Sequence, residues 1–179
     1  MDSRTQFTKT TVFLHWIIAL AIIGSLIFGM YLEDLPRSPD KGALVGIHKS
    51  IGVLILLVAL YRIYWRIRNG FPQRLTPVEQ WQEKVATIVH LTLLAGTVLM
   101  PISGILMTVG NGYPVAVFGL NLIPGGDKIE LLADAGHIVH GLGAKVMIAA
   151  VLLHVAAAVK LQLSTKDGSL ARMFGRKVS

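Results

Sequence analysis

Six histidines are the residues whose type and spacing best suit chemistry in this chain: His15, His48, His90, His137, His140 and His154. All lie in long apolar stretches, where an ionisable side chain is costly unless it has a function. Those stretches contain no Asp or Glu, which argues against a proton relay or a cation transporter built on carboxylates. Cysteine is absent, which excludes thiolate metal sites, iron–sulfur clusters and covalent c-type haem attachment. Neutral imidazoles without thiolates suit a non-covalently bound haem iron.

Four apolar stretches can carry these histidines across a membrane as helices. Hydrophobic residues make up 53% of the 179-residue chain and charged residues 15%, against about 25% in a soluble domain. A helix needs about 20 apolar residues to span a bilayer, which predicts spans at 12–32, 43–64, 85–109 and 135–162. The first run is too long for a signal peptide, and no cleavage site follows it. The intervening segments, of which 110–134 is the longest, are predicted to be loops.

These spans predict one all-α domain over residues 1–179, a four-helix up-down transmembrane bundle. Pro101 lies inside the third span and is expected to kink it.

The basic residues indicate an orientation. One side of the predicted bundle carries Arg4, Lys9, Arg62, Arg66, Arg68, Arg74, Lys84, Lys160, Lys166, Arg172, Arg176 and Lys177. The other side carries Arg37, Lys41, Lys49 and Lys128. The positive-inside rule therefore places both termini in the cytoplasm. The net charge of +7 then reflects topology, and no nucleic-acid partner is expected.

Depth in the bundle pairs four of the histidines. His140 and His154 are 14 residues apart, which is about 21 Å of helical rise and within about 40° of one helix face. In an antiparallel bundle His48 reaches the depth of His140, and His15 reaches the depth of His154. Two facing imidazoles are the axial ligands that a b-type haem requires. The sequence therefore predicts two stacked haems, on His48–His140 and on His15–His154, that pass electrons across the bilayer.

Two histidines remain outside these pairs. His137 precedes His140 by one turn and is the alternative ligand, although it lies closer to the membrane surface. His90 has no predicted partner and is expected to bond to a carbonyl or to a haem propionate.

Three basic residues are candidates for contact with haem propionates. Lys145 is the one interior charge of the fourth span, where it either meets a propionate or extends towards the headgroups. Arg62 and Arg66, one turn apart, contact either propionates or lipid phosphates.

Several short motifs, in order along the chain, match one family. They are Leu14-His15-Trp16, His48-Lys49-Ser50-Ile51-Gly52 followed by Arg62 and Arg66, His90 eleven residues before Pro101, the loop from Asn111-Gly112-Tyr113-Pro114 to Phe118-Gly119, and the His140–His154 spacing. Over nearly its whole length the chain resembles the bacterial cytochrome b561 family of four-helix, di-haem b inner-membrane proteins. The resemblance implies that His15, His48, His140 and His154 are the haem ligands. Some members carry a histidine just after the last ligand, where this chain reads Val155–Leu161.

The resemblance implies electron transfer between the periplasmic side and the quinone pool. Some members resemble superoxide oxidases, so superoxide and ubiquinone are the expected partners besides membrane lipid. Lys49 and Lys145 flank two of the ligands in sequence and are the candidates for steering superoxide. The alternative function is a cytochrome b subunit that links a partner dehydrogenase or hydrogenase to quinone. A haem-free helical scaffold is the third class, and a colourless protein would identify it.

Overall fold

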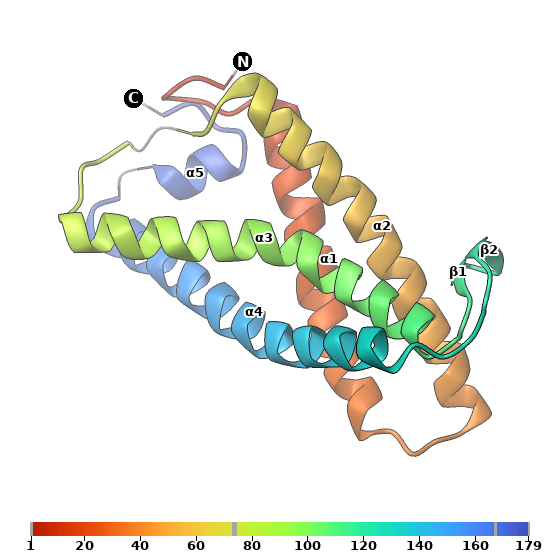
Figure 1. The fold of residues 1–179 in the computed structure, drawn as a ribbon. Helices are drawn as coiled ribbons and strands as arrows, with labels where there is room; N and C mark the ends of the chain where they lie inside the picture. Colours follow the sequence, from red (N-terminus) through yellow and green to blue (C-terminus); the bar gives the residue numbers. More distant parts are fainter. Residues whose placement is uncertain (1, 73–74, 167, 179) are drawn as a thin grey trace.

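Four long helices dominate the structure, a computed structural model that describes residues 2–72, 75–166 and 168–178 (Figure 1). They are α1 (Lys9–Asp34), α2 (Pro39–Asn69), α3 (Gln80–Gly110) and α4 (Glu130–Ser164), and a short α5 (Ser169–Met173) follows. All four long helices are long and apolar enough to cross a membrane. Each contains one predicted span and extends beyond it at both ends, so the predicted four-helix bundle is confirmed.

Local sequence signals set the ends of α2. The Ser38 side chain accepts a hydrogen bond from the Lys41 N–H (3.1 Å), and Pro39 occupies the first turn, where its missing N–H costs nothing. At the other end Gly70 has a φ of 78°, and its N–H donates to the Arg66 carbonyl (2.8 Å). Glycine adopts this left-handed conformation without strain, so α2 stops there.

The connector between α3 and α4 departs from the predicted loop because it contains a β-hairpin. Strands β1 (Val115–Val117) and β2 (Leu120–Ile123) pair antiparallel. Phe118 and Gly119 between them have φ values of 46° and 89°, as a two-residue hairpin turn with the favoured twist requires. Phenylalanine is rare in that conformation. Because the turn reads Phe-Gly and not the favoured Asn-Gly, the sequence contains no signal for a hairpin.

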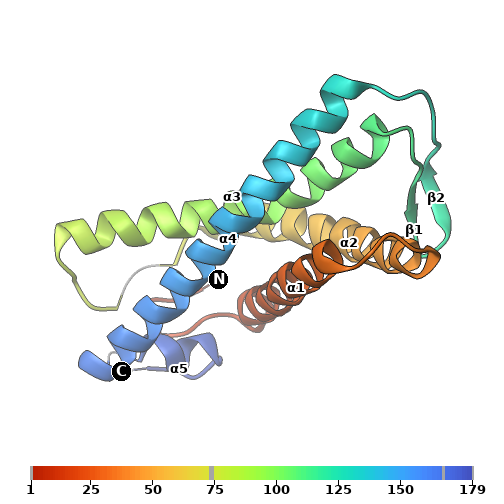
Figure 2. The same cartoon turned by 90° about the horizontal axis from the view of Figure 1, so that it is seen from below.

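The helices pack in chain order, and both termini lie at one end of the bundle (Figures 1 and 2). Extensive contacts join α1 to α2, α2 to α3 and α3 to α4, whereas α4 makes little contact with α1 or α2 in the described chain. We call the end with residues 2–8 and 168–178 the terminus end, and the end with residues 35–38 and 111–129 the loop end. The middle of α3, the stretch that contains Pro101, is bent in both views.

The buried apolar core lies midway between the two ends. It consists of Ile18, Ile22, Ile55, Ala59 and Met147. Met147 is seven residues from both His140 and His154 on α4. The core therefore separates the loop-end histidines from the terminus-end histidines with apolar side chains.

Glycines allow α3 and α4 to approach closely. A Cβ atom on Gly136 would lie 2.5 Å from the Met107 backbone nitrogen, and one on Gly110 would overlap the backbone of Ala133. Small residues at such contacts are typical of packing between membrane helices. This close contact also fixes where α4 presents its histidines relative to α3.

An ion pair ties the N-terminal segment to α2 at the terminus end. The Asp2 carboxylate accepts hydrogen bonds from the Thr8 N–H (2.8 Å), the Thr11 hydroxyl (2.8 Å) and the Arg66 guanidinium (2.8 Å). Burial alone would raise the pKa of Asp2, but these donors outweigh it and hold the pKa below its usual value. Asp2 is therefore ionised at neutral pH and neutralises a guanidinium that is only 8% exposed.

The C-terminal segment closes the same end. The indole N–H of Trp16 donates to the Met173 carbonyl (2.8 Å), and the same indole stacks on the Phe174 ring (5.1 Å between centroids). The Val178 N–H donates to the Thr5 carbonyl (3.0 Å). The two terminal segments thus pack against each other beside the start of α1.

Candidate functional site

Two pairs of histidine rings face each other across the bundle. His48 on α2 and His140 on α4 have ring centroids 6.3 Å apart, at an interplanar angle of 85°. His15 on α1 and His154 on α4 have the same separation of 6.3 Å, at 55°. The structure thus brings together the rings that helix depth pairs, and α4 supplies one ring to each pair.

The separation suits two ligands on opposite sides of one metal ion. A bond from a metal to an imidazole nitrogen is about 2.0–2.1 Å long, and that nitrogen lies about 1.1 Å from the ring centroid. Two rings that share one metal would therefore have centroids about 6.3 Å apart. Both observed separations match this value.

At the loop end, the backbone of α3 orients the His140 ring. His140 Nδ1 lies 3.0 Å from the Met100 carbonyl and 3.0 Å from the Ser103 hydroxyl. A carbonyl only accepts, so Nδ1 carries the proton and the lone pair of Nε2 stays available. Outer hydrogen bonds of this kind fix the tautomer of histidines that bind metals.

Its partner His48 has an unsatisfied nitrogen. The Nδ1 atom of His48 is buried and has no hydrogen-bond partner among the described residues. Glycines lie opposite both rings: a Cβ on Gly29 would be 3.4 Å from the His48 ring, and one on Gly104 would be 3.4 Å from the His140 ring. The loop-end pair therefore combines available ring nitrogens with space beside the rings.

At the terminus end, further aromatic residues surround the pair. The His90 ring lies 5.2 Å from that of His154, and the Trp16 ring lies 5.4 Å from that of His15. The sequence predicted no histidine partner for His90, because spacing alone does not fix how α3 is rotated towards α4. The structure adds His90 to the terminus-end cluster.

Two arginines of α2 lie beside this cluster in different environments. Arg62 is partly buried and lies one turn before Arg66, on the terminus-end half of α2. Arg66 forms an ion pair with Asp2. The sequence predicted only propionates or lipid phosphates as its partners. Asp2 is 64 residues away in sequence, so no local pattern could reveal this pair. Arg62 is therefore the arginine better placed to meet an anion between the paired rings.

The two candidate lysines also differ in position. Lys49 is partly buried at the loop end, with its Nζ 5.7 Å from the centroid of the Tyr113 ring. Lys145 is exposed on α4, five residues beyond His140 towards the middle of the bundle. His137, the alternative ligand, is exposed. Of the two lysines, Lys49 is the one near the loop-end surface.

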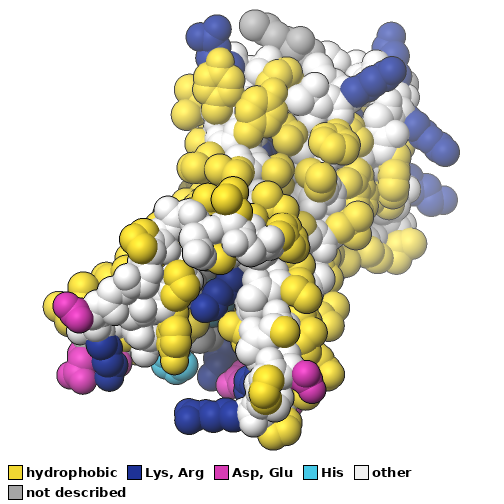
Figure 3. All heavy atoms as spheres, turned by 90° about the vertical axis from the view of Figure 1, so that its right-hand side faces the viewer, with side chains coloured by type: hydrophobic (Ala, Val, Ile, Leu, Met, Phe, Trp, Pro, Cys, Tyr) yellow, Lys and Arg dark blue, Asp and Glu magenta, His cyan; other side chains and the backbone are white. Residues whose placement is uncertain are grey.

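The loop end is hollowed between two arms of the molecule (Figure 3). Lys or Arg side chains are visible within the hollow, and a histidine is visible at its edge. Acidic side chains lie at the tips of both arms. The hollow at the loop end is therefore lined in part by basic side chains, although acidic side chains lie around its rim.

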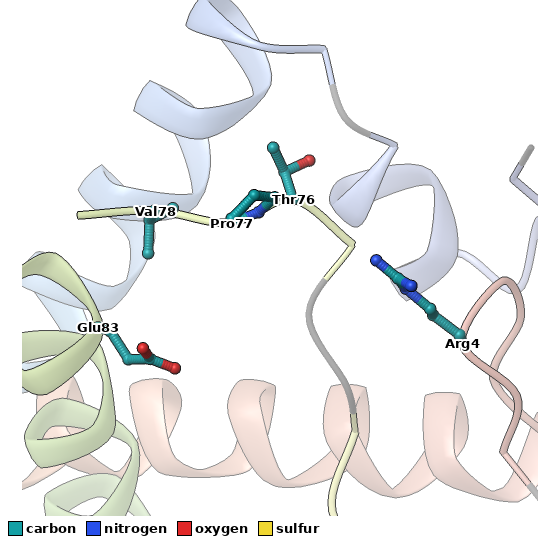
Figure 4. Close-up of a pocket in the computed structure, with 5 residues that line it drawn as sticks. All are labelled: Arg4, Thr76, Pro77, Val78 and Glu83. Carbon is teal, nitrogen blue, oxygen red and sulfur yellow. The ribbon is translucent and has the colours of Figure 1, made fainter. Parts of the chain in front are cut away.

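A cavity of about 350 Å³ lies elsewhere, outside the spans at the terminus end (Figure 4). It is lined by Arg4 from the N-terminal segment, by Glu83 from α3, and by Thr76, Pro77 and Val78 between them. No histidine lines it. This cavity does not belong to the histidine site.

The donor set fits a haem better than a bare metal ion. The described residues contain no group of three or more His, Cys, Asp or Glu side chains that could hold a metal. Two imidazoles complete the coordination of an iron whose other four ligands come from a porphyrin. The limited contact between α4 and the α1–α2 pair is compatible with a flat group between the paired rings.

Comparisons with known proteins agree with this fit. Residues 6–176 match the sequence model of the family described as prokaryotic cytochrome b561. The chain is 28% identical to cytochrome b561 homolog 2 of Escherichia coli (strain K12), over 92% of this chain and 89% of that protein. It is 24% identical to cytochrome b561 homolog 1 of the same strain, over 96% and 98%. It is also 28% identical to cytochrome b562 of Cereibacter sphaeroides, over 97% and 98%. The chain belongs to the prokaryotic cytochrome b561 family, and it is a membrane-embedded b-type cytochrome of electron transfer.

Proposed function

We propose that this cytochrome holds two b-type haems and moves electrons from superoxide at the loop end to ubiquinone at the terminus end. Two superoxide anions would give up one electron each and leave as dioxygen. One quinone would take up both electrons and two protons to become the quinol. A bound haem supplies the one-electron chemistry, and the chain supplies ligands, orientation and electrostatics.

The observation that carries this proposal is the pair of equal ring separations, 6.3 Å at each end of the bundle. His48 and His140 would hold one iron, and His15 and His154 the other. With about 21 Å of rise between its two histidines, α4 would hold a ligand near each face of the membrane. An arrangement of this kind serves transfer across the bilayer rather than chemistry at one surface.

Basic side chains support both ends of the route. Arg62, on the terminus-end half of α2, would neutralise haem propionates there, and Lys145 would do so from α4. At the loop end Lys49 follows His48 directly and would attract an anion such as superoxide. Its contact with Tyr113 holds it at the loop-end surface.

An apolar groove on α4 supports quinone binding at the terminus end. It begins next to His154 and is lined by Leu152, Val155, Ala156, Val159, Lys160, Leu163 and Ser164. Apolar side chains suit the isoprenoid tail of a quinone, and the groove ends in polar groups near the membrane surface. Some family members carry a further histidine after the last ligand. In this chain the apolar stretch at that position is compatible with binding the tail of a quinone.

We also propose that the terminus end faces the cytoplasm. Among the described residues visible in Figure 3, the terminus end presents Lys and Arg and no acidic side chain, whereas the loop end presents both signs. This distribution supports the positive-inside assignment of the inner membrane. Of the residues behind that assignment, Arg74 lies outside the described residues.

Stopped-flow mixing of the oxidised, haem-loaded protein with superoxide tests the donor. We expect haem reduction that slows with ionic strength and slows by about two- to tenfold in Lys49→Gln, because one attractive charge beside the entry site is lost. Ubiquinone should reoxidise the protein.

The matched control is Lys128→Gln, which removes the same charge at the loop end from an exposed pair with Glu130 (3.2 Å). It should leave the rate within about twofold of the unmodified protein. Reduction no faster than spontaneous dismutation of superoxide would contradict this donor. Electrons would then come from a partner dehydrogenase or hydrogenase subunit.

A further inference from the structure

The connector that carries the β-hairpin has an unusual composition for a loop outside the spans. Residues 111–126 contain no charged side chain, and the two charges of the connector, Asp127 and Lys128, come just before α4. Large apolar side chains of the hairpin are exposed, with Phe118 at 66%, Leu120 at 67% and Leu122 at 52%. An apolar patch of this kind marks a surface that binds something other than water.

A buried hydrogen bond fixes the position of the hairpin against α2. The Phe118 N–H donates to the Ser50 hydroxyl (2.9 Å), and Ser50 is only 2% exposed. Strand β1 faces the bundle and packs against α2, with Val115 buried. Every residue of β2 is exposed. The hairpin turn therefore lies at the level of Ser50, with one strand facing away from the bundle.

The level of Ser50 is close to the membrane boundary at the loop end. Ser50 precedes Arg66 by 16 residues, which is about 24 Å of helical rise. The hydrocarbon core is about 30 Å thick. With Arg66 at the terminus-end boundary, Ser50 lies about 6 Å inside the opposite one. Exposed side chains of α2 below this level, such as Leu57 at 58%, face lipid.

The backbone of the hairpin limits how deep it can lie. In the part of the chain that the structure describes the sheet has two strands, so the outer edge of β2 has no neighbouring strand there. Open sheet edges do not occur in the hydrocarbon region, because their N–H and C=O groups need partners. The open edge of β2 must therefore stay among headgroups and water. The turn, whose Phe118 N–H bonds to Ser50, and the apolar side chains reach the acyl chains.

We propose that the hairpin is an interfacial anchor in which Phe118, Leu120 and Leu122 insert between the phospholipid headgroups and acyl chains at the loop end. Lipid is the occupant that the position favours, because the patch continues the lipid-facing surface of α2 at the level of the boundary. The anchor would hold the hairpin, and through Ser50 the segment next to His48, at a fixed depth. This proposal does not depend on the electron donor or on the number of haems.

The absence of cysteine provides a direct test of the depth of the hairpin. A nitroxide label on Leu120→Cys would be the only label in the chain. Power-saturation electron paramagnetic resonance in phospholipid nanodiscs then measures access to oxygen, which concentrates in lipid, and to a water-soluble nickel chelate. Leu57→Cys in the middle of α2 is the lipid control, and exposed Lys128→Cys is the aqueous control.

We expect the Leu120→Cys label to show access to the nickel chelate at least about threefold lower than the Lys128→Cys label, with oxygen access closer to that of Leu57→Cys. The label on Leu122→Cys should give the same result, and this variant replaces Leu120→Cys if that variant does not fold. Nickel access equal to that of Lys128→Cys would overturn the proposal, because the hairpin would then lie in water. Low access to both reagents would overturn it as well, because a protein would then cover the patch.

Discussion

Replacing His154 with alanine is expected to lower the haem content from about two to about one per chain. A haem held by His15 and His154 would lose one of its ligands, while His48 and His140 would still hold the other. His15→Ala should lose the same haem, and His48→Ala and His140→Ala should each lose the loop-end haem. Haem content by pyridine haemochrome, with reduced-minus-oxidised spectra and redox titration, identifies which haem remains.

The chain provides matched controls for this experiment. His137→Ala removes an exposed imidazole one turn from His140 and should keep both haems. His90→Ala is the stricter control, because its ring lies 5.2 Å from that of His154. Loss of a haem in either control would show that the ligand assignment at that end is wrong. Equal loss of both haems in all four ligand variants, in protein that remains folded, would contradict the pairing.

Substituting alanine at Gly136 is expected to separate α3 from α4 and to reduce the loop-end haem selectively. Its Cβ would lie 2.5 Å from the Met107 nitrogen and 2.9 Å from the Ser103 carbonyl. These are backbone atoms, so a helix must move. Overpacking of this kind costs about 1–3 kcal/mol, which would lower the melting temperature by about 2–12 °C. The same shift would disturb the hydrogen bonds of His140 to Met100 and Ser103.

Gly141→Ala is the matched control on the same helix. A Cβ at Gly141 would meet no atom of the described residues within 4 Å, and alanine favours helix over glycine. This variant should therefore keep both haems and an unchanged or slightly higher melting temperature. Thermal unfolding followed through haem absorbance compares the two variants. Equal behaviour would contradict the view that Gly136 sets the α3–α4 contact.

Much of the bundle could be predicted because membrane helices carry strong local signals. Runs of about 20 apolar residues identify the spans. The His48 and His140 rings could be predicted to meet because they lie at the same depth in the membrane. The rise per residue and the direction of each helix give that depth. His15 and His154 come together for the same reason. Their role as ligands is a prediction that the experiments above address.

Features that depend on helix rotation or on distant contacts could not be predicted. The approach of His90 to His154 depends on how α3, bent in the stretch with Pro101, turns towards α4. The Asp2–Arg66 pair joins residues far apart in sequence. The hairpin turn at Phe118 depends on a hydrogen bond to Ser50, 68 residues earlier. Such contacts carry no periodic pattern that a sequence reveals.

The most direct test of the central claim is the haem-to-protein ratio of the purified chain together with its reduced-minus-oxidised spectrum. We predict about two haems per chain, both of b type and extractable without breaking a covalent bond, because two imidazole pairs are present and cysteine is absent. A ratio of about one would contradict the account, since one of the two histidine pairs would then hold no haem.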